Sequence, residues 1–468
     1  MSVTSQLSTF VAGLDSARLA PELVRRARLL VLDFAGNAVR ARHEAESTPP
    51  LLAAANALGL GQGSARVFAD ANGYAPAGAA LINGSLAHSL DFDDTHAAAV
   101  VHPGATVIPA ALAAAEMEGA SGAETLAAIV AGYEVALRIA LALPAGAHYE
   151  RGFHPTATCG AFGAAAAAGR VFRLDRHRIA SALGIALSQA SGSLQFLANG
   201  AWTKRFQVGW ASMAGLVAAT LACEGYKGAS EALEGRHGFF RAYAPAPDPE
   251  RVLRGLGQEW ELMATAVKPY PSCRWGHAAI DAALALRAEH GLEADRIEEA
   301  RLGLSRAGML LIGEPAQKKA DPRNIVDAQF SGPFVVAAAL ATGEMAWDSY
   351  RLLGDARLRA LMARIHCEAD PEIEAEFPAH MAGKLTVRAG GRVLERKVVD
   401  PKGEPSNFLT EAELRAKFAG LANSVIGDVR AANLAETVLR LDRLEKAGAI
   451  LAASLPERAH FGRDDLAL

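Results

Sequence analysis

Three aspartates, a threonine and three histidines crowd residues 87–102, which begin the segment "AHSLDFDDTHAAAVVHPGATVIPAA" (87–111). Side chains of these types can bind a metal ion, transfer protons, or cap a helix and line a hydrated loop. The possible metal ligands are Asp91, Asp93, Asp94, His96 and His102. Their spacing matches neither a calcium loop nor the His-Glu-x-x-His helix of zinc proteases. The proline and glycine after His102 fix a bend, which favours a functional role for this histidine.

Two further segments place basic side chains where they could meet an anion. In "RGFHPTATCGAF", His154 stands just ahead of an expected helix of small residues, where the helix dipole disfavours its protonated form. The alternative is that His154 has a purely structural role, with its hydrogen bonds made inside the protein. In "NGAWTKRFQVGW", small and apolar residues flank Lys204 and Arg205. A buried lysine is unfavourable unless it is paired, and pairing with an anionic substrate would satisfy it.

A third segment, "VKPYPSCRWGHAAIDAAL", lies where the sequence pattern changes and offers Lys268, Cys273, Arg274 and His277. Junctions between domains often form pockets, although a plain hinge explains the prolines equally well. No surrounding signature supports Cys273 as a nucleophile. The four cysteines are far apart and form no Cys-x-x-Cys pair, so the usual spacing of a disulfide framework, a structural zinc site or an iron–sulfur cluster is missing.

The composition favours packed helices and a small-molecule partner. Of 468 residues, 51% are hydrophobic and 6% aromatic, with alanine throughout. The net charge of −4 comes without a basic stripe, so we expect no nucleic-acid partner. The N-terminus lacks the pattern of a secretory signal, and the most apolar long segment contains Glu134 and Arg138. A buried helix explains that segment better than a membrane span does, so we expect a cytoplasmic protein without a membrane partner.

Helical periodicity dominates residues 5–265, and the pattern changes near residue 266. Residues 297–305 alternate like a strand, and residues 384–399 predict a hairpin that turns at Gly390 and Gly391. Helical patterns return after residue 402, where Thr410 and Glu413 form a capping box like that of Ser121 and Glu124. The glycines of "GLGQGSARV" (59–67) predict a turn between helices. We therefore expect a mainly α protein, with an all-helical domain from residues 1–265 plus 403–468 and an α+β domain at 266–402.

Several segments, taken together, resemble the MmgE/PrpD family, which includes 2-methylcitrate dehydratase, cis-aconitate decarboxylase and iminodisuccinate epimerase. The matching pieces run from about residue 20 to residue 340. They are "ARLLVLDFAGNAV", "LINGSLAHSLDFDDTHAAAVVHPGATVIPAALAAAE", "GFHPTATCGAFGAAAAAG", "TKRFQVGWASMAG", "VKPYPSCRWGHAAIDAAL" and "DAQFSGPFVVAAAL". The resemblance implies a large helical domain, a smaller α+β lid, a cleft between them and a homodimer.

The resemblance also implies the site and the chemistry. The family's active-site positions fall on Asp91, Thr95, His102, His154, Lys204 and Lys268. The decarboxylase branch carries a histidine soon after the last lysine, where this sequence has Ser272 or Cys273, with His277 a few residues on. We take Thr95, Cys273, Arg274 and His277 as candidate substrate-binding residues. Family members are expected to use no cofactor and no metal.

Dehydration, decarboxylation and epimerisation all pass through an unstable carbanion or enolate-like dianion beside a carboxylate. Lys204 and Lys268 would stabilise its charge, and one of His102 and His154 would move the proton. Asp91 would take or orient a proton. We therefore predict a lyase of the dehydratase type acting on a small di- or tricarboxylate. The alternatives are an epimerase, a decarboxylase and a non-catalytic carboxylate-binding protein, and a metal-dependent hydrolase is a weaker fourth.

Overall fold

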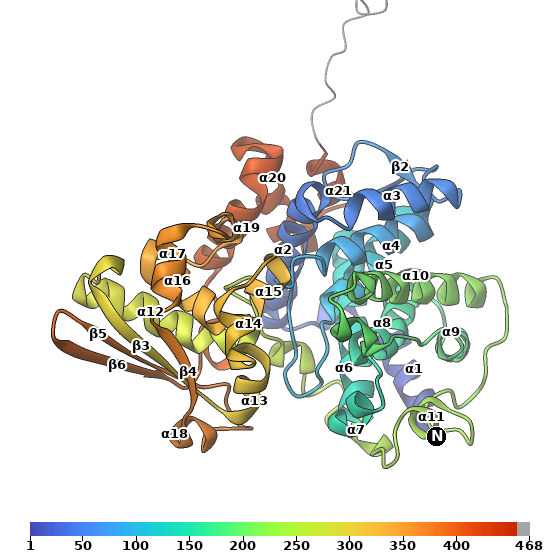
Figure 1. The fold of residues 1–468 in the computed structure, drawn as a ribbon. Helices are drawn as coiled ribbons and strands as arrows, with labels where there is room; N and C mark the ends of the chain where they lie inside the picture. The colour runs from blue at the N-terminus through green and yellow to red at the C-terminus, as the bar shows by residue number, and fades with distance from the viewer. Residues whose placement is uncertain (456–468) are drawn as a thin grey trace, which may run out of the picture. The chain divides into compact units, whose positions relative to one another are not determined.

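The structure is a computed structural model, which describes residues 1–455. The chain forms two compact units, one of residues 1–265 with the chain from 414 onward, and one of residues 266–413. Both are mainly helical apart from one four-stranded sheet in the second unit (Figure 1), which confirms the predicted fold class. Residues 403–413 group with the second unit, whereas the sequence pattern placed the start of the returning helical part at residue 403.

The first unit is a bundle of helices. Its helices are α1 Val3–Gly13, α2 Pro21–Glu44, α3 Thr48–Ala57, α4 Pro76–Ala87, α5 Gly104–Glu118, α6 Gly122–Leu141, α7 Ala145–Glu150, α8 Pro155–Val171, α9 Arg176–Leu187, α10 Thr203–Cys223, α11 Phe239–Tyr243, α20 Asp428–Leu439 and α21 Ala449–Ala453, with α19 Glu411–Ile426 beginning just before the boundary. Strands β1 Ala65–Arg66 and β2 Gly73–Tyr74 pair as a short antiparallel ribbon. Strand β1 lies within residues 59–67, the glycine-rich segment predicted to form a turn between helices.

The core of the first unit is made by α4, α5, α6, α8 and α10, whose small residues let the helix axes approach closely. Helices α4 and α10 cross at two glycines: a Cβ on Gly84 would lie 2.9 Å from the Cα of Gly209, and a Cβ on Gly209 would lie 2.2 Å from the carbonyl oxygen of Leu81. Any larger residue would therefore force the two helices apart. This crossing sets the end of α4 beside the start of α10.

The apolar segment with two internal charges is helix α6, and it is buried as predicted. Glu134 and Arg138 are both fully buried and form an ion pair, with Arg138 Nε 2.8 Å from Glu134 Oε2. The Arg138 guanidinium also donates to the carbonyl oxygens of Val252, Arg254 and Glu259. Such a buried pair is tolerated because nearly every polar group in it has a partner. The predicted capping box of Ser121 and Glu124 opens this helix.

Among the described residues, one helix is long and apolar enough to cross a membrane by length and composition, and it is α10. It packs against α8 and α4, and 61% of its most apolar window is buried. A helix packed in the core of a helical unit can be as long and as apolar as a membrane span.

The second unit holds a four-stranded sheet with helices packed on it. Its strands are β3 Ile297–Leu304, β4 Ile365–Ala369, β5 Gly383–Ala389 and β6 Arg392–Val398, in the order β4-β3-β5-β6. Strand β4 runs parallel to β3, and the other neighbours are antiparallel. Its helices are α12 His277–His290, α13 Arg306–Gly308, α14 Ala316–Ala320, α15 Ile325–Gln329, α16 Gly332–Thr342, α17 Ala356–Met362 and α18 Pro371–Glu374.

Two local predictions are confirmed in the second unit. Strand β3 occupies the segment predicted to alternate, and β5 and β6 form the predicted hairpin. Gly390 and Gly391 have φ values of 57° and 71°. Two consecutive residues with positive φ match the twist of a two-residue hairpin turn, and glycine adopts that conformation at little cost. The capping box of Thr410 and Glu413 is also present, at the start of α19.

Candidate functional site

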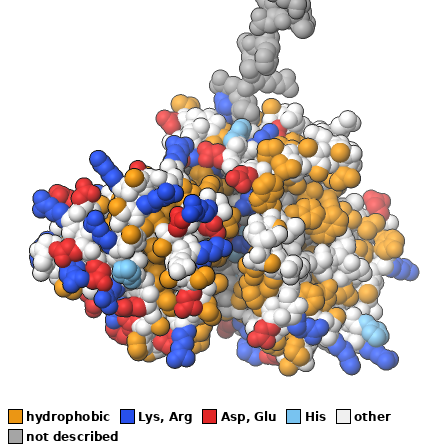
Figure 2. Space-filling view, viewed as in Figure 1, with side chains coloured by type: hydrophobic (Ala, Val, Ile, Leu, Met, Phe, Trp, Pro, Cys, Tyr) orange, Lys and Arg blue, Asp and Glu red, His pale blue; other side chains and the backbone are white. Residues whose placement is uncertain are grey.

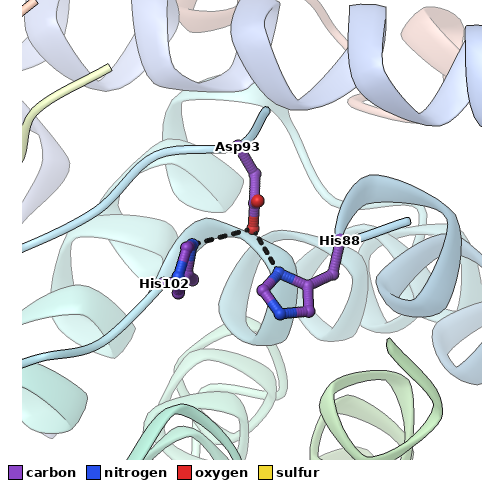
Figure 3. A group of neighbouring side chains, drawn as sticks. All are labelled: His88, Asp93 and His102. Atoms are coloured by element: carbon purple, nitrogen blue, oxygen red, sulfur yellow. Dashed lines mark hydrogen bonds and ion pairs between the residues drawn. The ribbon is translucent and has the colours of Figure 1, made fainter. Parts of the chain in front are cut away.

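A buried carboxylate that bridges two imidazoles lies at the centre of the polar segment (Figure 3). His88 is the C-cap residue of helix α4, and Asp93 lies in the loop that follows. His102 lies two residues before the start of α5. Asp93 Oδ2 lies 2.7 Å from His88 Nδ1 and 3.3 Å from His102 Nδ1. The side chains of His88 and Asp93 are 0% and 3% exposed, while that of His102 is 17% exposed. One carboxylate oxygen therefore holds both rings by their Nδ1 atoms.

The charges of this group follow from its burial. Burial alone would raise the pKa of Asp93, but attraction to His88 and His102 and their hydrogen bonds hold it well below the usual value. Burial lowers the pKa of His88 to about 4, although Asp93 opposes this shift. At neutral pH, Asp93 is therefore an anion and His88 a neutral imidazole. A neutral imidazole beside a carboxylate donates the hydrogen on the nitrogen that faces it.

An ion pair between Asp91 and Lys204 lies in the same neighbourhood. Lys204, in the first turn of α10, places Nζ 2.7 Å from Asp91 Oδ1. Asp91 has a φ of 53°, a left-handed conformation that aspartate tolerates better than most residues. Burial opposes the charge on Lys204, but Asp91 outweighs it and raises the pKa of this lysine. The lysine is therefore a partly buried ammonium ion at neutral pH.

His154 sits directly ahead of α8, where a short backbone ladder holds it. Its N–H donates to the carbonyl oxygen of Gly192 at 3.1 Å, and Leu194 N–H donates to Gly152 at 2.8 Å. The ring accepts or donates at Nδ1, which lies 2.8 Å from Gln207 Nε2 on α10. Burial holds the pKa of His154 well below its ordinary value, and repulsion from a protonated His88 and from the ammonium group of Lys204 adds to this.

The distances between rings show that these groups form one cluster in the first unit. The His88 and His102 rings meet edge to face with centroids 4.7 Å apart, and the His88 and His154 centroids are 6.1 Å apart. The charge of Lys204 acts on both His88 and His154. Four of the five predicted catalytic residues, Asp91, His102, His154 and Lys204, are thus gathered around His88.

The cluster also lies at the N-terminal ends of three helices. His102 precedes α5, His154 precedes α8, and Lys204 is in the first turn of α10. The N–H of His102 donates to Thr156 Oγ1 at 3.2 Å, which ties the starts of α5 and α8 together. Helix N-termini carry partial positive charge, so these ends and Lys204 together favour an anionic ligand.

The remaining polar residues of the segment face different partners. Thr95 is 6% exposed, and its hydroxyl oxygen is buried without a hydrogen-bond partner in the described part of the chain. Asp94 accepts from Tyr133 at 2.6 Å and from the N–H of Gly104 at 3.1 Å, and burial raises its pKa to about 8. His96 Nε2 lies 3.6 Å from Glu261. The five possible metal ligands of the sequence therefore do not converge on one point.

One smaller group could still hold a metal ion: His88, Asp93 and His102, whose ligand atoms lie within 4.8 Å of one another. A zinc ion about 2.0–2.2 Å from each ligand would keep tetrahedral ligand atoms roughly 3.3 Å apart. The 2.7 Å between His88 and Asp93 is shorter than that and is an ordinary hydrogen-bond length. The geometry therefore fits a hydrogen-bonded His88–Asp93 pair, with His102 in ion-pair contact, better than a metal site.

The other predicted residues lie in the second unit, where each is buried or tied to a partner. Lys268 is 4% exposed and Cys273 is 8% exposed, with the Cys273 N–H donating to Gln329 at 2.9 Å. Arg274 pairs with Glu404. His277 begins α12 and places Nε2 3.2 Å from the carbonyl oxygen of Ser272. A substrate contact for Arg274 or His277 would have to compete with these bonds, and their roles stay predictions.

Sequence reasoning did not identify the partners that orient the histidines. His88 and Gln207 were not singled out, and Asp93 was considered only as a metal ligand. Gln207 follows Lys204 by three residues and therefore lies on the same face of α10. That spacing is the signal that could have drawn attention to it. His88 occurs within the quoted polar segment, but only the folded loop brings it to Asp93.

Comparisons with known proteins agree with this architecture. The MmgE/PrpD N-terminal domain matches residues 5–252, and the MmgE/PrpD C-terminal domain matches residues 270–443. A cis-aconitate decarboxylase-like protein of Aspergillus oryzae is 28% identical, covering 96% of both chains. The cis-aconitate decarboxylase of Aspergillus terreus is 26% identical over 94% of both chains, and that of Mus musculus is 27% identical over 95% of this chain and 91% of its own. The chain belongs to the MmgE/PrpD family.

Proposed function

We propose that the protein is a lyase that acts on a small di- or tricarboxylate through a carbanion beside a carboxylate. The single observation that carries this proposal is the cluster in the first unit. There, a paired ammonium ion, Lys204, adjoins three imidazoles, two of them held by a buried carboxylate. These groups supply positive charge and proton transfer from the chain itself, so the proposal invokes no metal or cofactor.

The reaction follows from where charge develops. A carboxylate of the substrate binds near Lys204, the N-terminal ends of α5, α8 and α10, and the Thr95 hydroxyl. An imidazole then removes the proton next to that carboxylate, and the negative charge spreads into the carboxylate group. Preorganised donors stabilise this dianion more than the ground state, which lowers the barrier. Lys268 is proposed to add a second ammonium ion, and this part rests on the family resemblance alone.

Two lyase reactions use the same carbanion. Loss of water from a β-hydroxy acid is our first candidate, because Ser272 and Cys273 stand where the decarboxylase branch carries a histidine. Loss of carbon dioxide from an unsaturated tricarboxylate is the second candidate, and the names of the relatives favour it. At 26–28% identity, a relative's name does not fix which bond breaks in this chain.

An epimerase would also need the carbanion, but it must exchange a proton on opposite faces with two bases. A carboxylate-binding protein would need only the positive charges. A buried carboxylate that positions two imidazoles has no purpose in mere binding, so the cluster supports catalysis over binding alone.

The test is a substrate screen by proton NMR in deuterated water, with a chelator present. The panel contains citrate, 2-methylcitrate, cis-aconitate and iminodisuccinate. We expect loss of water or of carbon dioxide from at least one of the first three. Deuterium incorporation without either loss would establish the epimerase instead. Tight binding without any turnover would contradict the proposal and support a binding protein.

The homodimer and the cytoplasmic location remain proposals, and one surface feature supports the first. Trp202, Phe206 and Trp210 recur at four-residue spacing along α10 and are 36–44% exposed. Leu58 and Leu197 are also exposed. Figure 2 shows hydrophobic side chains spread over the face of the first unit where α3, α4 and α10 lie. Contiguous exposed aromatic residues are typical of surfaces that a second chain covers.

A further inference from the structure

The orientation of one amide, Gln207, is fixed by its backbone contacts. The N–H of Ser193 donates to Gln207 Oε1 at 2.9 Å, and Gln207 Nε2 donates to the carbonyl oxygen of Ser193 at 3.2 Å. If the amide were flipped, its NH₂ group would face the Ser193 N–H and its oxygen would face the carbonyl, so two bonds would become repulsive. Gln207 is 8% exposed, and water offers little compensation for such a mismatch.

This orientation determines the tautomer of His154. The NH₂ group of Gln207 lies 2.8 Å from His154 Nδ1 and has only hydrogens to offer. His154 Nδ1 must therefore be the acceptor, and the ring hydrogen must be on Nε2. Because burial holds the pKa of His154 well below its ordinary value, the ring stays in this neutral form at pH 7.

The tautomer of His102 is the opposite one. Asp93 is an anion and can only accept, so its Oδ2, 3.3 Å from His102 Nδ1 in an ion-pair contact, favours the tautomer with the hydrogen on Nδ1. In that tautomer, His102 Nε2 carries the lone pair that can accept a proton. The same carboxylate fixes His88 in the same form through the 2.7 Å contact. The side chain of His88 is fully buried, whereas that of His102 is partly exposed, so His102 is the ring that a substrate can reach.

We propose that Gln207 and Asp93 are positioning residues that set opposite tautomers in two histidines, so that His102 is the general base and His154 is a neutral N–H donor. This inference rests on the proposed lyase function for its chemical meaning, but not for the tautomers themselves. A neutral imidazole is a poor acid, because losing its second proton would leave an imidazolate. His154 therefore donates a hydrogen bond to the developing dianion and keeps its proton.

The assignment gives a balanced elimination. His102 Nε2 takes the proton next to the substrate carboxylate and becomes an imidazolium, which Asp93 stabilises. The electron pair of that C–H bond moves into the carboxylate, where Lys204 and the His154 N–H hold the charge. The pair then forms the new double bond as the C–O bond breaks. The departing hydroxyl takes the proton from His102 and leaves as water, so His102 is neutral again.

The direct test is nitrogen-15 NMR of protein labelled at histidine. In the unaltered protein, we expect His154 to show its hydrogen on Nε2 and its bare nitrogen at Nδ1. His102 should show the reverse. Resonances are assigned by loss of one signal set in His154→Ala and in His102→Ala. A hydrogen on His154 Nδ1, or on His102 Nε2 in the neutral ring, overturns the proposal without any enzyme assay.

Gln207→Glu supplies the functional test. A carboxylate at this position accepts from the Ser193 N–H but cannot donate to His154, so the hydrogen moves to Nδ1 and the pKa of His154 rises. We expect kcat and kcat/KM to fall together by about 100- to 1,000-fold, the loss typical for one oxyanion donor. The dependence of kcat/KM on pH should show an additional pKa, that of His154. The matched control is Gln189→Glu, since Gln189 is a partly buried glutamine whose amide donates to the carbonyl oxygen of Ile185 at 3.4 Å.

The outcomes separate the two claims. If Gln207→Glu keeps the tautomer and the rate of the Gln189→Glu control, the positioning role is wrong even when the enzyme is a lyase. If no carboxylate is turned over, the proposed function fails while the spectrum still reports the tautomers. Should Gln207→Glu fail to fold, the spectrum of the unaltered protein decides alone.

Discussion

At the scale of single residues, the proposed site depends on contacts that orient the groups proposed to react. Asp91, His102, His154 and Lys204 could be picked out because a buried ionisable side chain beside small or bend-forming residues is uncommon. Gln207 acts on His154 from 53 positions away in the sequence. A hydrogen bond of that kind depends on where two helices start in space, which no local pattern encodes.

The neutral histidines make stability depend on pH. The pKa of His88 is about 4 in the folded protein and about 6.5 when unfolded, so between these values the unfolded chain binds more protons. Stability is therefore fully present above pH 6.5 and falls as the pH drops toward 4. His154 acts in the same direction. From His88 alone, we expect the free energy of unfolding, measured with urea, to be about 1–2 kcal/mol lower at pH 5 than at pH 7.

His88→Asn provides the comparison, because its amide can still donate to Asp93 but does not titrate. The difference in unfolding free energy between pH 7 and pH 5 should shrink in this variant. An unchanged difference would show that His88 is not a source of the acid sensitivity.

At the scale of elements, short-range features were predictable and helix packing was not. The hairpin at Gly390 and Gly391 and the capping box of Ser121 and Glu124 follow from a few adjacent residues, and both are present. The crossing of α4 and α10 depends on Gly84 and Gly209, which lie 125 positions apart (209 − 84). Many glycines in the chain look alike in sequence, so nothing local marks these two as the contact.

Gly84→Ala should therefore disturb both the fold and the site. Its Cβ would lie 2.8 Å from the carbonyl oxygen of Ala105 and 2.9 Å from the Cα of Gly209, so backbone must move. Overpacking of this kind typically destabilises by about 1–3 kcal/mol. Thermal unfolding measures the loss. The control is Gly420→Ala in α19, where a Cβ meets nothing within 4 Å and the exchange should be neutral or slightly stabilising.

At the scale of the whole molecule, family membership could be inferred from six segments in order, because their combination is far more specific than any one of them. The two-part organisation was visible as a change in periodicity near residue 266. The assembly of chains is harder to predict from sequence, because a dimer surface is a set of side chains from separate elements. Among the described residues, the exposed stripe of Trp202, Phe206 and Trp210 supports a dimer.

The dimer proposal predicts a particle of twice the 48.9 kDa chain mass by light scattering. Phe206→Glu and Trp210→Glu place a charge in the middle of the stripe and should shift the protein toward the monomer. Val429→Glu is the control, since Val429 is an exposed apolar residue on α20, away from the stripe. A dimer that resists both stripe variants would place the interface elsewhere, and a monomeric unaltered protein would refute the proposal.

The most direct test of the central claim is the turnover of Lys204→Met on whichever acid the NMR screen identifies, measured beside Lys227→Met. Lys227 is an exposed lysine just beyond the end of α10, so its loss leaves the cluster intact. The account predicts that Lys204→Met stays folded and loses at least about 100-fold in kcat/KM, as removal of preorganised charge typically does. A folded Lys204→Met protein with the same turnover as Lys227→Met would contradict it.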